Sequence, residues 1–79
     1  MYLQFQGTLA GHGQDIEIEV EMEAIQEGIR VLKHLGRFLW HGPHRFAVGQ
    51  QYHLKLKDGR FYEVQIMEIK SDLVKFETF

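Results

Sequence analysis

The chain has 79 residues, and we expect residues 1–79 to form a single domain. It has no cysteine, which excludes disulfides and thiolate metal sites and favours a cytoplasmic protein, because small secreted domains usually carry disulfides. No apolar stretch approaches the roughly 20 residues that span a bilayer, so we expect no membrane partner. Met1 leads directly into a strand pattern, from which we expect a complete small protein without a signal peptide.

Charge is distributed unevenly along the chain. The totals are 11 acidic and 9 basic residues, a net charge of −2. All six Asp, Glu, Lys or Arg residues in the range 1–28 are acidic, whereas the range 29–79 has nine basic residues against five acidic ones. Binding responds to the local field more than to the total charge. Each of the two regions is therefore a candidate binding surface.

The first 24 residues alternate between polar and apolar side chains in two runs. Leu3, Phe5 and Leu9 alternate with polar residues, and the range 15–24 places apolar residues at even positions and acids at every odd one. Such a period of two is typical of strands with one buried face. A turn at Gly11-His12-Gly13 separates the runs, so the pattern predicts a hairpin.

The hydrophobic period changes at about residue 24. Placed at 100° steps, the apolar residues and glycines of the range 24–39 occupy one half of a helix, and the polar residues occupy the other. Acids near the start and bases near the end suit the helix dipole. Gly28 and the missing N-cap residue count against a helix. The segregation nevertheless predicts one amphipathic helix at about 24–39.

Three further strands are expected in the last part of the chain. Alternation over the ranges 52–57, 62–69 and 74–77 is interrupted by turns at Asp58-Gly59 and Ser71-Asp72, and a slip near Met67 indicates a bulge. The element order is ββαβββ. The sequence therefore predicts an α+β fold, in which a small five-stranded antiparallel curved sheet or open barrel is covered by one helix.

Glutamates at every second position are the strongest functional feature of the sequence. Along a strand their side chains stand about 6.8 Å apart on one face and repel one another unless positive charge lies opposite. Lys55, Lys57 or Lys75 on a neighbouring strand, or water, would supply that compensation in a purely structural interpretation. The functional alternative is a phosphate-mimic-like surface for a basic partner. Its candidate contacts are Glu17, Glu19, Glu21 and Glu23.

An alternative binding surface lies between Gly28 and Lys57, where the chain has no acid. Basic residues interleaved with aromatic ones can neutralise phosphates and stack on bases. Phe38 falls on the predicted apolar half of the helix, whereas Trp40, beside Pro43, is a better candidate for exposure. The isoelectric point near 6.2 counts against a dedicated nucleic-acid binder. The candidate contacts are Arg30, Lys33, Arg37, Trp40, Arg45, Lys55 and Lys57.

Catalytic and metal-binding patterns are weak. His41-x-x-His44 has no acid or cysteine nearby to complete a ligand set, so we predict no metal site and no cofactor. The only serine, Ser71, lies in a turn, and no phosphate-binding or dinucleotide-binding glycine motif occurs. We therefore predict that the protein is not an enzyme.

These observations favour a small non-catalytic interaction protein, an inhibitor or regulator of a protein partner. It would bind a basic surface of that partner through the strand that carries the four glutamates, the glutamate strand. The alternative is a small nucleic-acid-binding barrel that uses the basic and aromatic stretch at 28–57. An acidic edge on one copy and a basic surface on another also make a homodimer possible. The two proposed functions differ in which face of the molecule binds the partner.

Overall fold

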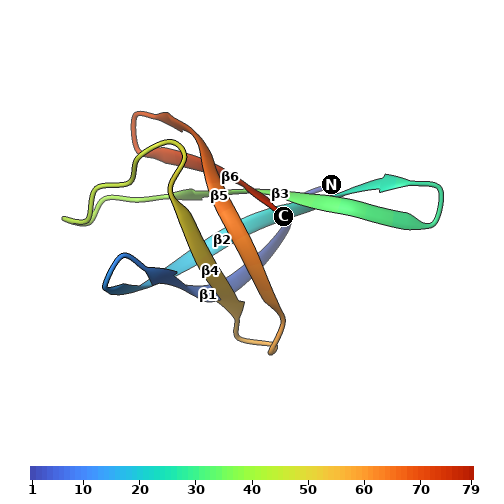
Figure 1. The fold of residues 1–79 in the computed structure, drawn as a ribbon, viewed down its shortest axis with the longest axis horizontal. Coiled ribbons are helices and arrows are strands. Elements are labelled where there is room, and N and C mark those ends of the chain that lie inside the picture. Colours follow the sequence, from blue (N-terminus) through green and yellow to red (C-terminus); the bar gives the residue numbers. More distant parts are fainter.

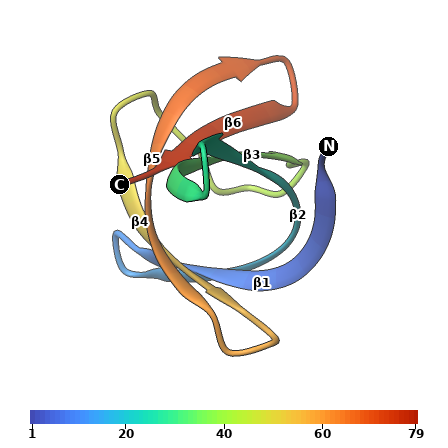
Figure 2. The ribbon, with the colours of Figure 1, turned by 90° about the vertical axis from the view of Figure 1, so that its right-hand side faces the viewer.

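The computed structural model describes residues 1–79 as six antiparallel strands that close into a barrel in the order β1-β2-β3-β6-β5-β4 (Figures 1 and 2). No helix is present. The strands are β1 (Leu3–Gly11), β2 (Gln14–Glu27), β3 (Arg30–Leu39), β4 (Gln51–Leu56), β5 (Phe61–Lys70) and β6 (Leu73–Thr78).

The expected helix, the expected five strands and the α+β class are all wrong, and the fold is an all-β closed barrel of six strands. Residues 24–39 form the end of β2, a turn and β3. Gly28 in the turn has a φ of 62°, a left-handed conformation that glycine adopts without strain. The register also shifts between Ile25 and Gln26. The bulge and the turn shift the positions of the apolar residues. Two successive strands therefore show the same spacing of apolar residues as one amphipathic helix.

The three turns expected from the sequence are confirmed. β1 and β2 are joined through His12-Gly13, and β5 and β6 through Ser71-Asp72. Between β4 and β5, the Asp58 carboxylate accepts a hydrogen bond from the Arg60 backbone N–H at 3.0 Å. The bulge expected near Met67 is also present, because the register of β5 with β6 shifts between Ile66 and Glu68.

β2 and β5 each belong to two parts of the barrel wall. The first part of β2 pairs with β1 and its last part with β3, while the first part of β5 pairs with β4 and its last part with β6. In Figure 1, β4 and β5 cross β2 and β3 steeply. The barrel thus consists of two crossed sheets whose corners are strands with bulges or bends.

The core lies between these crossed sheets. It is made by the even-numbered residues of β2 from Ile16 to Met22 and the inward residues of the other strands, thirteen hydrophobic side chains in all. Phe76 of β6 lies directly over Gly36 of β3, its partner in the register, where a Cβ atom would collide with the edge of the ring at its Cζ. The alternation in the sequence therefore predicted correctly which side chains of β4 and of the first part of β2 point into the core.

The two ends of the barrel differ. At one end the β3–β4 loop, residues 40–50, folds back, and Phe46 packs against Phe38 and Tyr52 with ring centroids 5.3 and 5.5 Å away. At the other end the β2–β3 hairpin projects beyond the barrel as an arm, residues 24–34 (Figure 1). Ile29 and Leu32 on this arm are 102% and 52% exposed. The aromatic rings of the looped end are therefore buried or half-buried, whereas the apolar side chains at the tip of the arm are exposed.

Candidate partner-binding strand

The four glutamates predicted to bind a partner all lie on the outer face of β2, while Ile16, Ile18, Val20 and Met22 point into the core. Two of the four are neutralised within the chain. Glu21 accepts a hydrogen bond from the Arg37 guanidinium at 3.3 Å, and Glu23 contacts the amino group of Met1 at 2.8 Å. The compensating cations are thus Arg37 and the N-terminus, and not the three lysines that the sequence suggested.

Glu17 and Glu19 form no ion pair. On β1 their register partners are Thr8 and Gln6, and beyond them come Lys55 on β4 and Lys57 just after it. Lys57 lines a shallow pocket together with Glu17 and Glu19 but forms an ion pair with neither. An exposed charge pair without direct contact is weakly coupled in water and is screened by salt. Of the four glutamates on the outer face of β2, which we call the glutamate ladder, Glu17 and Glu19 therefore remain available for a partner.

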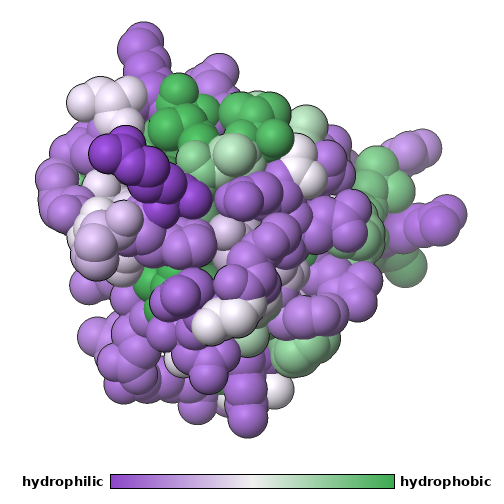
Figure 3. Space-filling view, turned by 60° about the vertical axis from the view of Figure 1, so that its left-hand side comes forward, coloured by the Kyte–Doolittle hydropathy of each residue, from purple (hydrophilic) through white to green (hydrophobic).

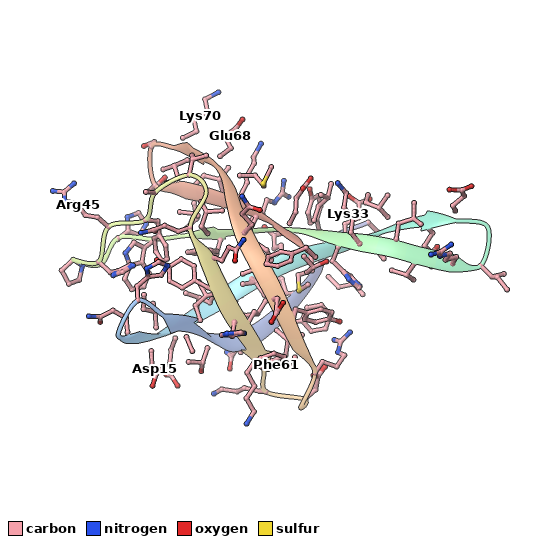
Figure 4. All side chains as sticks on the ribbon, in the orientation of Figure 1. Asp15, Lys33, Arg45, Phe61, Glu68 and Lys70 are labelled. Atoms are coloured by element: carbon pink, nitrogen blue, oxygen red, sulfur yellow. The ribbon has the colours of Figure 1, made fainter.

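The basic residues of the alternative site do not form one surface. Arg30 lies at the tip of the arm, whereas Arg45 lies on the loop at the opposite end. Lys33 on the arm and Arg45 are far apart in Figure 4. Lys33 is also paired with Glu77 at 2.9 Å, and Arg37 with Glu21. Lys55 at the end of β4 and Lys57 just after it are close neighbours, two positions apart.

Trp40 and Phe46 belong to an aromatic cluster at the looped end. The Trp40 indole N–H donates a hydrogen bond to the His44 carbonyl at 2.8 Å, and its ring lies 5.8 Å from that of Phe46. Trp40 is half-buried, so the exposure expected for it is only partial. The hydrogen bond and the ring contacts hold the loop over the barrel end, which leaves less of Trp40 free to stack on a base.

Tyr52 anchors the same cluster from β4. Its hydroxyl donates to the Gln50 side-chain oxygen at 2.9 Å and lies 2.9 Å from His44 Nε2. Gln50 also accepts the Ala47 N–H at 2.9 Å. Burial raises the pKa of Tyr52 above its usual value, since ionisation would place a charge among apolar rings. The cluster is thus a structural element built from one network.

The histidines have separate surroundings. His41 lies 3.3 Å from Asp72, and His53 lies 3.9 Å from Glu63 and stacks on Phe61. His34 lies beside Tyr62, and burial, with a smaller contribution from the charge of Arg60, lowers its pKa. No group of three His, Cys, Asp or Glu side chains is arranged to hold a metal ion.

Sequence reasoning missed part of the surroundings of the glutamate strand. Asp15 continues the series of odd-numbered acids and points away from the barrel in Figure 4. Residues of β3 and of the loop after it line two clefts beside β2. Arg37 and Trp40 among them were predicted for the alternative site, but no sequence pattern placed them beside the glutamates. Figure 3 shows that the loop side of the molecule is mainly hydrophilic, with hydrophobic residues gathered in separate patches.

Comparison of the chain with protein-family models, with curated proteins and with solved structures finds no match. None of the structure's elements is a helix able to cross a membrane. The geometry of the barrel and the placement of its charges are therefore the basis of the proposed function.

Proposed function

We propose that this chain is a non-catalytic interaction domain that binds a basic segment of a partner protein through the outer face of β2, and that it regulates or inhibits that partner. The observation that carries the proposal is the difference within the glutamate ladder. Glu21 and Glu23 are paired with cations of their own chain, whereas Glu17 and Glu19 form no ion pair, although Lys57 lies nearby. Two adjacent carboxylates without compensation attract a partner with matching positive charge.

A labelled ten-residue peptide with alternating lysine and threonine is a suitable probe, measured by fluorescence anisotropy at low and near-physiological salt. Exchanging both Glu17→Gln and Glu19→Gln should weaken binding about tenfold, because each exposed charge pair contributes up to about 1 kcal/mol. A matched control carries Glu27→Gln at the arm end of β2 and Glu68→Gln on β5, which changes the net charge equally but away from Glu17 and Glu19. The control should bind as the parent chain does.

The two double variants separate a local surface from a general attraction. Equal weakening in both would mean that only net charge matters, and the assignment of the site to β2 would fail. Unchanged binding in both would also refute the proposed contact. Because exposed pairs are screened, parent binding should fall as salt rises.

The nucleic-acid alternative stays a prediction. Its candidate residues lie on the arm, the loop and two different strands, so no continuous basic surface supports it. Anisotropy with short labelled DNA and RNA tests it directly. Binding that weakens steeply with salt and is lost after Arg37→Ala and Arg45→Ala would support it over the glutamate strand.

A further inference from the structure

The first part of β2 is paired on one side only and leaves an open sheet edge in the barrel wall. β2 pairs with β1 from Gln14 to Met22, but with β3 only from Glu21 to Glu27. Beyond Arg37, β3 turns away to continue along β6. In Figure 1 the two strands diverge toward the loop end. The side of β2 that faces β3 therefore has no partner strand before Glu21.

The direction of the backbone groups at this edge follows from a hydrogen bond on the next strand. The Gln6 carbonyl accepts the Lys57 N–H at 2.9 Å, so Gln6 turns its peptide groups toward β4. Peptide groups of an antiparallel strand alternate between its two neighbours. The odd-numbered residues of β1 therefore bond to β2, where their register partners are Ile16, Ile18 and Val20.

The intervening residues of β2 turn their N–H and C=O groups toward the open side. These residues are Asp15, Glu17 and Glu19. None of them takes part in the backbone hydrogen bonds that the chain forms outside its strand pairs. The same residues carry the outward carboxylates, so free backbone groups and free charges coincide. Unpaired edges of this kind are templates for an added strand.

Two clefts lie along this edge and provide room for another chain. One, of about 430 Å³, lies between Asp15–Glu17 and the side chains of Trp40 and Pro43. The other, of about 300 Å³, lies between Glu19 and the end of β3 at Leu39. The clefts are successive along β2, and together they follow the unpaired residues.

We propose that an extended basic segment of a partner protein adds to the open edge of β2 as a further strand. This inference rests on the proposed function and specifies how the same carboxylates are used. Residues of the segment opposite Glu17 and Glu19 share their outward face, and they stand two positions apart. The residue between them faces inward beside Ile18. The segment therefore has two basic residues with an apolar residue between them, and the carboxylates of β2 attract the basic pair.

The experiment uses a labelled peptide of alternating lysine and valine, flanked by polar residues, and two backbone-methylated forms of it. In one form the amides of the lysines are methylated, and in the other the amides of the valines. Only lysine amides face the edge when lysines lie opposite Glu17 and Glu19. Methylated lysines should weaken binding at least tenfold, whereas methylated valines should change it less than threefold.

Amide hydrogen exchange of the full chain supplies an independent measurement. Saturation with the unmethylated peptide should slow exchange of the Glu17 and Glu19 amides at least tenfold. The amides of Ile16 and Ile18 already bond to β1, so their exchange should change little. The methylated-valine peptide should give the same protection, and the methylated-lysine peptide should give none.

The outcomes separate this inference from the proposed function. Equal binding of the two methylated peptides, with the tenfold loss in Glu17→Gln/Glu19→Gln retained, overturns strand addition and leaves a contact by side-chain charge. Binding that is indifferent to those two substitutions overturns both. Protection of Glu17 and Glu19 together with discrimination between the methylated peptides supports strand addition.

Discussion

Both ends of the barrel carry apolar residues, but the two ends differ in how far these residues are buried. At the looped end, Phe46 is half-buried against Phe38 and Tyr52, and the loop is fixed by the network around Gln50. On the arm, Ile29 and Leu32 have no such cover and remain largely exposed. Hydrophobicity alone therefore did not decide burial. A residue is buried here only where a second element lies across it.

The same comparison applies to stability. Removal of a packed side chain costs the free energy of its contacts, whereas removal of an exposed one costs little. The looped end should consequently contribute to the free energy of unfolding, and the tip of the arm should not. Substitutions at the two ends, and at the point where β3 passes from the arm to the barrel, test this difference.

The largest effect is expected at Gly36, where the arm enters the barrel. A methyl group there would collide with the Phe76 ring, so Gly36→Ala should lower the free energy of unfolding in urea by about 2–3 kcal/mol. In a Phe76→Leu background the same substitution should cost clearly less, because the ring is gone. Additive costs in the double variant would show that the two residues do not make the described contact.

Phe46→Ala should lower the free energy of unfolding by about 2 kcal/mol, less than for a fully buried ring because Phe46 is only half-buried. Leu32→Ala on the arm is the control and should change it by less than about 0.5 kcal/mol. Both values come from urea denaturation with a common slope. A cost at Leu32 equal to that at Phe46 would mean that the arm is packed in solution, for example in a dimer.

Tyr52→Phe should destabilise the chain by about 1 kcal/mol at pH 7, because the Gln50 and His44 hydrogen bonds are lost. Burial raises the folded-state pKa of Tyr52, so the unfolded chain loses this proton first as pH rises. The stability that the neutral hydroxyl contributes is complete below about pH 10 and declines above it. The difference between parent and variant should therefore narrow above pH 10, and a constant difference would exclude this linkage.

His34 should give a smaller effect of opposite pH direction at the arm end. Burial, aided by Arg60, lowers its pKa, so the folded state favours the neutral imidazole. This contribution is present above about pH 6.5 and declines as pH falls below it. Parent and His34→Gln should therefore converge in stability on acidification. Arg60→Gln should weaken the pH dependence only in part, since burial is the larger cause.

Much of the barrel could be predicted from local patterns. The alternation in β2 identified Ile16, Ile18 and Val20 as core residues, and Asp58-Gly59 identified a hairpin. These predictions hold because strand period and turn chemistry act within a few residues. Residues 24–39 were mistaken for a helix because a bulge in β2 and a tight turn at Gly28 shift the apolar positions of β3 relative to those of β2. A pattern of apolar residues cannot separate two offset strands from one helix.

For the candidate site, the sequence by itself determined the row of outward acids on one strand, because a period of two leaves no other arrangement. Which acids remain without a cation was decided only by the tertiary structure, through the approach of Arg37 to Glu21 and of Met1 to Glu23. The open edge beside Glu17 and Glu19 was likewise decided by the departure of β3 toward β6. The physical reason is that ion pairs and strand pairing join residues distant in the chain, whereas alternation is a property of each strand alone.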